Sequence, residues 1–335
     1  MKTSRIDQSV PSNLLAFLIG VIGLLMLSSF ITVAAQSAVS GLRIGIGPRA
    51  LAMGGAYVAV ADNYSAPFWN PAGIGKIDKL EAGGGNMDRF GLRLNYTHFG
   101  GGATIPLQVP LIEVISGAGG LLRYTIEVRA TDSEGNPLGK VTITEDKYLG
   151  TLGLKLSDFG YIGGNIKGYH FLHPKMGVDQ QDAKASGLGY DVGFLAGPFK
   201  GLWFGGSGFD LTGTDIKWEN TPTEPTDTAP PRYSLGTAWI SDKYNFILSG
   251  QYDFGEASQN SMKAGGEYRF SLVKNIAISI RGGLVVPKDS EAYFSAGGGM
   301  ILFESLKADF AWVQNKALEA KNTSDTLVFG AGFEF

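Results

Sequence analysis

The sequence lacks cysteine and carries little charge. Without cysteine it has no disulfide, no thiol nucleophile and no cysteine-ligated metal. Charged residues make up 18% of the chain against about 25% in an average protein. The formal net charge is −3, which excludes the broad basic footprint of a nucleic-acid-binding protein. Hydrophobic residues make up 44% and aromatic residues 11%, too much for an intrinsically disordered chain.

Glycine is the residue in excess. It occupies 49 of 335 positions, about 15%, which is roughly twice its average share. The glycines follow no three-residue period, so the chain is not collagen-like. What remains is a weakly charged, glycine-rich chain long enough for one large domain or two modest ones.

The N-terminus has the pattern of a secretory signal. Lys2 and Arg5 precede an uncharged stretch from Leu14 to Ala35 that ends in small residues. A basic start, an apolar region and a small-residue cleavage site predict a signal peptide over residues 1–35. An uncleaved membrane helix is the alternative, since the stretch is long enough to span a bilayer. Either interpretation sends residue 36 onward out of the cytoplasm.

The rest of the chain is dominated by alternating segments. At the C-terminus, Leu327, Phe329 and Phe333 fall on one face while Gly330 and Gly332 fall on the other. Period two indicates a strand. The same alternation of large apolar residues with small or charged ones recurs over residues 244–254, 262–270, 274–284 and 305–312.

The second face of these segments is rich in glycine with isolated charges, which is typical of the inside of a closed barrel. An apolar face toward lipid and a polar face toward the lumen predict an all-β fold, a transmembrane antiparallel β-barrel over residues 79–335. In hydrocarbon a sheet must close, because no water satisfies a free edge. Phe335 ends the last strand and resembles the terminal aromatic that outer-membrane assembly machinery reads. We expect about fourteen strands: 79–86, 91–105, 112–129, 140–156, 160–172, 184–197, 200–211, 231–241, 243–254, 262–272, 274–286, 291–303, 305–316 and 325–335. Their connections alternate between tight turns and long polar loops, apart from a short one at 87–90 and a turn with two prolines at 106–111. Twelve or sixteen strands are the alternatives.

Residues 43–75 do not follow the barrel pattern. They contain Gly47-Pro48-Arg49-Ala50, Met53-Gly54-Gly55-Ala56 and Trp69-Asn70-Pro71-Ala72-Gly73. Pro48 predicts the start of a short helix that Gly54 and Gly55 end. These motifs resemble the start of the FadL-type outer-membrane transporter superfamily, which includes the PorV/PorQ-like barrels. The resemblance implies a fourteen-stranded barrel in which residues 36–78 fold inside as a hatch, with Gly54, Gly55, Trp69, Asn70, Pro71 and Ala72 as its motif.

What the resemblance implies for function differs by branch. FadL-like members bind hydrophobic molecules such as long-chain fatty acids and pass them across the bacterial outer membrane. PorV/PorQ-like members assist type IX protein secretion or surface attachment, and Trp69 and the predicted mature length of 300 residues are closer to that branch. A mainly structural barrel is the third hypothesis. The expected partners are membrane lipids and either a hydrophobic small molecule or a secreted protein. We expect no cofactor and no metal site, and no catalytic motif points to an enzyme.

Two sets of residues are candidate sites within the barrel. Gly117, Gly119 and Gly120 interrupt the third strand and predict either a kink that opens a lateral gate or a small patch against the hatch. Six charged residues of mixed sign are expected to line the lumen as a network that holds the wall and the hatch, with a selective ion or carboxylate site at Arg269 or Arg281 as the alternative. They are Lys263, Glu267, Arg269, Arg281, Lys307 and Asp309.

Two further groups are weaker candidates. His170 and His173 are three apart in a strand and so face opposite sides, which disfavours a shared metal. The acidic loop 212–230 is expected to be a solvated surface loop, with a divalent cation site as the alternative.

Overall fold

The computed structural model describes residues 40–78, 80–89, 92–131, 134–156, 160–255, 260–288, 290–315 and 324–335. The predicted signal peptide, residues 1–35, lies outside the described residues. Within the described residues, no helix is both long enough and apolar enough to span a membrane.

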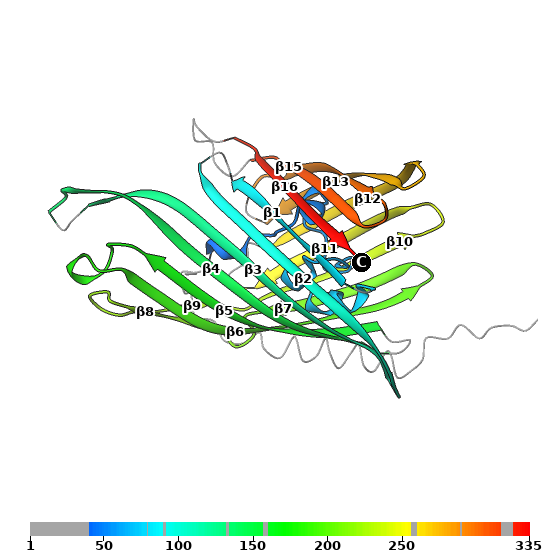
Figure 1. Ribbon diagram of the computed structural model, residues 1–335, viewed down its shortest axis with the longest axis horizontal. Helices are drawn as coiled ribbons and strands as arrows, with labels where there is room; N and C mark the ends of the chain where they lie inside the picture. The colour runs from blue at the N-terminus through cyan, green and yellow to red at the C-terminus, as the bar shows by residue number, and fades with distance from the viewer. Residues whose placement is uncertain are drawn as a thin grey trace, which may run out of the picture. The chain divides into compact units, whose positions relative to one another are not determined.

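The described residues form a closed antiparallel barrel of fourteen strands, as the sequence predicts. Each strand pairs with its neighbours in the chain, and β1 pairs with β16 from Glu81↔Glu334 to Asp88↔Leu327, which closes the cycle (Figure 1). The barrel strands are β1 (Leu80–Arg89), β2 (Leu94–Val109), β3 (Ile112–Thr131), β4 (Pro137–Leu156), β5 (Gly160–His173), β6 (Ala183–Phe199), β7 (Leu202–Phe209), β10 (Arg232–Ser241), β11 (Phe246–Gly255), β12 (Ser261–Val273), β13 (Ile276–Pro287), β14 (Tyr293–Leu302), β15 (Leu306–Val313) and β16 (Thr326–Glu334).

Two connections differ from the prediction. The turn expected at 106–111 is shorter than predicted, because β2 continues through Pro106 to Val109 across a register shift and only Pro110 and Leu111 form the turn. A bulge tolerates proline, which has no N–H to give to the ladder. The expected surface loop 212–230 instead contains a hairpin, β8 (Thr214–Glu219) and β9 (Thr226–Ala229). β8 pairs with the start of β6, and Ile216 is fully buried.

The two faces of the wall carry different residues. The apolar register faces outward and is exposed, with Met262 65%, Phe329 60% and Phe310 51% accessible. The inward register carries glycines and charged residues, such as Gly265, Glu267 and Gly330. An apolar surface this extensive around a closed barrel is stable in lipid rather than in water.

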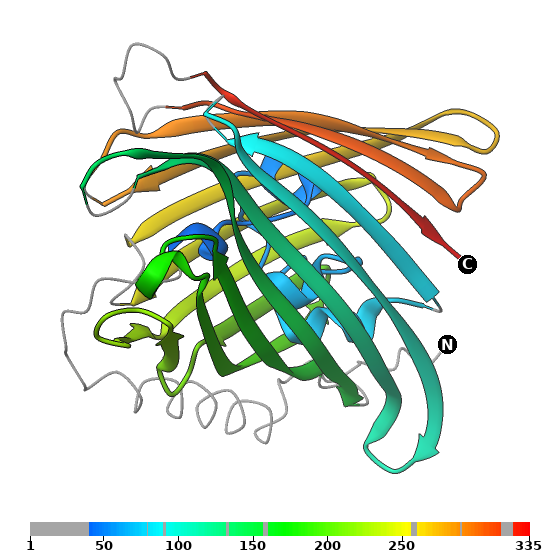
Figure 2. The ribbon, with the colours of Figure 1, turned by 60° about the vertical axis from the view of Figure 1, so that its left-hand side comes forward.

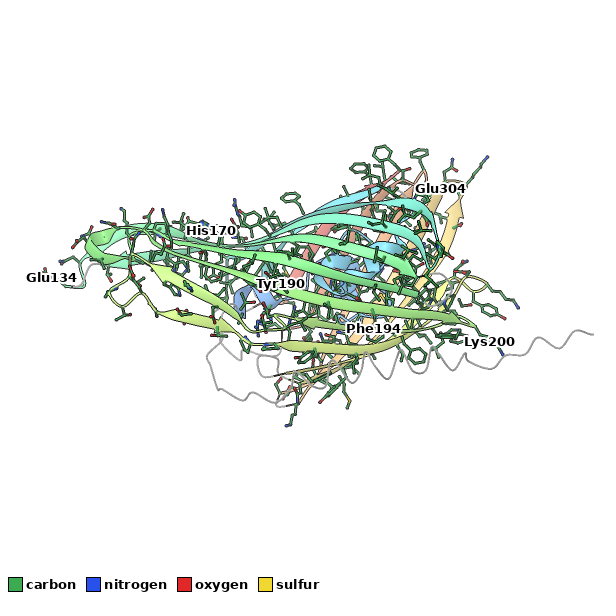
Figure 3. The ribbon with its side chains drawn as sticks, turned by 90° about the horizontal axis from the view of Figure 1, so that it is seen from below. Glu134, His170, Tyr190, Phe194, Lys200 and Glu304 are labelled. Atoms are coloured by element: carbon green, nitrogen blue, oxygen red, sulfur yellow. The ribbon has the colours of Figure 1, made fainter. Side chains whose placement is uncertain are left out.

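Polar outward residues mark one edge of the apolar surface. One polar residue from each of β1 to β5 is paired with the next across neighbouring strands. In strand order they are Asn86, Thr97, Arg123, Asp146 and His170. From Asp146 to the end of β4 at Leu156, the outward positions are apolar or glycine. Ten residues at about 3.3 Å each, tilted by about 40°, span about 25 Å, the height of a lipid-facing band. β3 and β4 continue beyond this edge toward a hairpin tip at Glu134 (Figure 3).

Aromatic residues mark the other edge, where the connections are short. Trp239, Tyr244, Tyr268, Phe303 and Phe335 are exposed there. Aromatic side chains concentrate where a barrel meets the membrane interface. The short connections therefore lie on one side of the membrane, together with the start of β1 and the end of β16. The long loops lie on the other side.

Candidate ligand site

Residues 40–78, called here the N-terminal segment, lie inside the barrel (Figure 2). The segment contains the short helices η1 (Ser40–Arg43), α2 (Pro48–Ala52), η2 (Ala66–Phe68) and η3 (Pro71–Lys76). It packs directly on inward glycines of the wall, where an added Cβ would overlap the segment. These are Gly83, Gly100, Gly102, Gly120, Gly153, Gly163, Gly193, Gly205, Gly236, Gly265, Gly283, Gly297 and Gly330. The glycine excess therefore lets wall and segment approach closely.

The Gly54-Gly55 part of the motif forms a tight turn after α2. Both glycines have positive φ, 67° and 71°, which side chains adopt at a cost. The backbone N–H of Gly54 donates to Ser295 Oγ of β14 at 2.9 Å. A Cβ on Gly55 would lie 3.0 Å from the ring of Trp69. The turn thus ties the end of α2 to the wall.

The Trp69-Asn70-Pro71-Ala72 part positions the middle of the segment. Trp69 Nε1 donates to Ile46 O at 2.9 Å, which joins two parts of the segment. Asn70 Nδ2 donates to Val58 O at 2.8 Å and to Phe194 O of β6 at 2.9 Å. Asn70 Oδ1 accepts from Ala72 N at 3.1 Å and caps η3, which begins at Pro71. Asn70 is therefore both a turn residue and a contact to the wall.

Four of the six predicted lumen charges meet at one point, called here the Glu267 cluster. Glu267 binds Arg281 at 2.6 Å and Arg269 at 3.3 Å, and Arg281 binds Asp309 at 2.5 Å. Arg49 of the N-terminal segment binds Glu267 at 2.7 Å. Because Arg281 already has two carboxylate partners, it is not placed to take a ligand carboxylate.

Asp62 completes this cluster from the N-terminal segment. It lies 2.5 Å from Arg49, and Tyr57 donates to it at 3.0 Å. Burial raises the pKa of Asp62, but the charges of Arg49 and Lys76 and the hydrogen bond from Arg49 together outweigh burial and hold the pKa below its ordinary value. Three cations within ion-pair distance, Arg49, Arg269 and Arg281, thus face three carboxylates, those of Asp62, Glu267 and Asp309. Lys76 of the N-terminal segment is a fourth cation nearby, and its charge also lowers the pKa of Asp62.

The other two predicted lumen charges lie in separate pairs. Lys263 binds Asp253 of β11 at 2.5 Å. Lys307 binds Glu81 at 3.1 Å and Glu334 at 2.8 Å, so it bridges the strands beside the barrel closure. The six residues therefore form three local groups along the wall.

The glycines of the third strand do not interrupt it. Gly117, Gly119 and Gly120 pair with both β2 and β4 inside a continuous β3, and no register shift falls at these positions. Gly117 and Gly119 face outward, where an added Cβ would meet nothing closer than 3.9 Å, whereas Gly120 faces the ring of Phe68. The expected interruption is wrong, because antiparallel pairing on both sides holds the glycines extended.

A cavity of about 510 Å³, called here the upper cavity, lies between the N-terminal segment and the long-loop side of the barrel. Its lining runs from Gly54, Gly55 and Trp69 to Pro287, Glu291 and Asn315 near the long loops. Ile44, Leu51, Met87, Val285 and Tyr293 supply apolar surface, and Arg43, Arg89, Arg232 and Lys263 supply positive charge. The volume falls within the range of small-molecule sites, about 300–1,000 Å³.

A second charge cluster, called here the Arg43 cluster, borders this cavity, and the sequence reasoning missed it. Lys167 binds Asp191 at 2.5 Å and Asp210 at 2.9 Å, and Asp210 lies 3.6 Å from Arg43. Arg232 donates to the carbonyl of Arg43 at 3.1 Å. Lys147 is buried beside them and donates to Leu42 O at 2.8 Å. The available signal was polar residues on the inward register of apolar strands, but the partners come from distant strands.

The two histidines lie on opposite faces, as their spacing predicts. His170 is exposed on the outer face opposite Asp146, whereas His173 lies 3.4 Å from Glu145. In the part of the chain that the structure describes, no group of three or more metal-ligating side chains converges.

Closed membrane barrels with an apolar outer face, short turns at one end and long loops at the other are outer-membrane proteins. The protein is therefore a β-barrel of the bacterial outer membrane. No family model and no curated protein sequence matches the chain.

Solved structures share the fold at low sequence identity. The Ralstonia pickettii toluene transporter TbuX has a TM-score of 0.57 and 11% identity over 87% of this chain and 98% of its own. The P. putida toluene transporter TodX has a TM-score of 0.52 and 9% identity over 87% and 99%. A Pseudomonas aeruginosa FadL homologue has a TM-score of 0.50 and 13% identity over 92% and 100%.

Proposed function

We propose that the protein passes hydrophobic small molecules across the outer membrane and that the N-terminal segment is its hatch. The observation that carries the proposal is the upper cavity, which extends from the loop side of the lumen to Gly54, Gly55 and Trp69 of the segment. A molecule entering from the loops would be held there until the segment moves. Long-chain fatty acids are one class of cargo, and small hydrocarbons like those named for the structural neighbours are another. We assign the protein no catalytic role.

Two adjacent residues offer a matched test. Val285 lines the upper cavity, whereas Val286 is exposed on the outer face. In vesicles containing the purified protein, we expect Val285→Trp to remove most of the flux of a hydrophobic fluorophore and Val286→Trp to leave it unchanged. Equal flux through both variants would refute passage through the cavity. Mass spectrometry of the purified protein would identify any hydrophobic molecule it retains.

One observation supports assistance to protein secretion as a second candidate. Beyond Thr125 and Thr144, β3 and β4 continue without β2 or β5 partners among the described residues. The resulting hairpin projects past the polar edge of the barrel, and free strand edges accept strands of other proteins (Figure 3). If the protein assists secretion, replacing residues 127–140 by a tight turn should abolish secretion and leave flux unchanged. If it only passes hydrophobic molecules, the same replacement should leave secretion unchanged.

A further inference from the structure

A row of aromatic side chains crosses the inner face of the barrel on the long-loop side, with one carboxylate at its centre. Register partners place Tyr124, Glu145 and Phe171 side by side on β3, β4 and β5. Tyr96 of β2 continues the row, and its ring centroid lies 4.9 Å from that of Tyr124. Because neighbouring strands lie about 4.8 Å apart, Tyr124 and Phe171 flank Glu145 directly.

The β8–β9 hairpin, which lies beside β6, completes the row (Figure 1). Ala185 of β6 pairs with Phe171 on one side and with Trp218 of β8 on the other. The indole of Trp218 lies 6.1 Å from the ring of Phe171 and 4.8 Å from the ring of His173. Phe171 is fully buried, whereas Tyr124, Trp218 and His173 are partly exposed. The row therefore presents aromatic surface to the loop side of the lumen.

Glu145 differs from the other inward carboxylates of the barrel strands. Each of the others lies within 3.1 Å of a lysine or an arginine; they are Glu81, Asp191, Asp253, Glu267 and Asp309. Among the described residues, the one ion-pair partner of Glu145 is His173 at 3.4 Å, which is a counter-charge only when protonated. Nε2 of His173 is buried without a hydrogen-bond partner. Lys147, the next inward residue on β4, donates to Leu42 O instead.

The surroundings of Glu145 favour a cation with an apolar body. Its side chain is only 14% exposed, and a carboxylate in such a place is costly without a full counter-charge. Asp227 of β9 adds a second negative charge, because it accepts from Trp218 Nε1 at 2.7 Å. The faces of aromatic rings attract cations, that of tryptophan most strongly. The missing partner is therefore positively charged, and the rings of Tyr124 and Trp218 would cover its apolar part.

We propose that Glu145, His173, Tyr124 and Trp218 form a binding site for an organic ammonium ion, an amine that carries an apolar body. The ammonium group donates to the Glu145 carboxylate and to Nε2 of His173 in its neutral form, and the apolar body lies against the two rings. The inference goes beyond the proposed passage of hydrophobic molecules, because none of these four residues lines the upper cavity.

The test compares two probes of similar shape, the cation 2-phenylethylammonium and the neutral 2-phenylethanol, on the purified full-length barrel by titration calorimetry. We expect wild type to bind the amine at least about 10-fold more tightly. Glu145→Gln should weaken amine binding by roughly 10- to 100-fold, the value of a charge-assisted hydrogen bond, and change alcohol binding little. Trp218→Leu should weaken amine binding by roughly 2- to 30-fold, the value of a cation–π contact.

Glu127→Gln is the matched control. It removes the same charge from the exposed face of β3, where Glu127 pairs with Lys140, and should leave amine binding unchanged. Glu145→Asp keeps the carboxylate and should retain the preference for the amine, so the test stays valid if Glu145→Gln fails to fold. Absence of amine binding, equal binding of amine and alcohol to wild type, or equal losses in Glu145→Gln and Glu127→Gln would each overturn the site. The readout is binding and not flux, so these outcomes leave the proposed function intact.

Discussion

The two charge clusters inside the barrel differ in their balance. In the Glu267 cluster, Arg49, Lys76, Arg269 and Arg281 face three carboxylates, and Arg49 joins the N-terminal segment to the wall through a short ion pair. In the Arg43 cluster, Arg43, Lys147, Lys167 and Arg232 face two carboxylates, and Arg43 is held by Pro230 O at 2.6 Å and by Asp210 at the longer distance of 3.6 Å. Buried charges are tolerated when they are paired at short distance, so the close pairs of Arg49 fix the segment more firmly than the longer contact of Arg43. The Glu267 cluster is therefore the stronger attachment of the segment to the wall.

Arg49 and Arg43, both in the N-terminal segment, should respond unequally to replacement. Arg49→Met leaves Glu267 and Asp62 short of a partner and should lower the free energy of unfolding by about 3 kcal/mol. Arg43→Met removes a hydrogen bond to Pro230 O and a longer ion pair with Asp210 and should lower it by only about 1 kcal/mol. Urea unfolding in vesicles measures both. A large loss in Arg43→Met would show that the clusters are equivalent.

Replacing Asn70 tests an attachment between the segment and the wall that uses neutral hydrogen bonds and no ion pair. Asn70→Ala removes the hydrogen bonds to the carbonyls of Val58 and Phe194 and the cap of η3. We expect a loss of about 2 kcal/mol in the free energy of unfolding. Protease digestion of the segment should increase in parallel. An unchanged digestion rate would mean that Asn70 acts only in a local turn.

Acid should weaken the Glu267 cluster through Asp62. Its pKa is lower in the folded protein than in the unfolded chain, so its stabilisation is complete above the unfolded pKa, near 4, and is lost as the pH falls through the folded pKa. Wild type should thus lose stability below about pH 4 more steeply than Asp62→Asn. Parallel curves of stability against pH for the two proteins would show that Asp62 does not contribute to the acid sensitivity of the Glu267 cluster.

The smallest effect is expected at Gly119. Its outward position has open space, so Gly119→Val should change the unfolding free energy by no more than about 0.5 kcal/mol and leave flux normal. Gly163→Val is the inward counterpart, because its Cβ would overlap the backbone of Pro71. That variant should fail to seat the segment. Impaired flux in Gly119→Val would support the hypothesis of a lateral gate at β3.

The sequence predicted the features that depend on period and chemistry along one strand. Alternation identified the closed fourteen-stranded barrel, and Pro48 and Gly54 identified the limits of α2. The sequence-based prediction failed where pairing with other strands decides the local structure. Gly117 to Gly120 remain extended because β2 and β4 hold them, and loop 212–230 forms a hairpin because β6 offers an edge. The Arg43 cluster joins residues from the segment, β4, β5, β6, β10 and the residue after β7, which no local pattern reveals.

The most direct test of the contrast between the clusters is the unfolding free energy of wild type, Arg43→Met and Arg49→Met, measured side by side in vesicles. We predict that Arg49→Met loses about 3 kcal/mol and that Arg43→Met loses about 1 kcal/mol. Equal losses in the two variants would contradict the account that the Glu267 cluster is the stronger attachment of the segment to the wall.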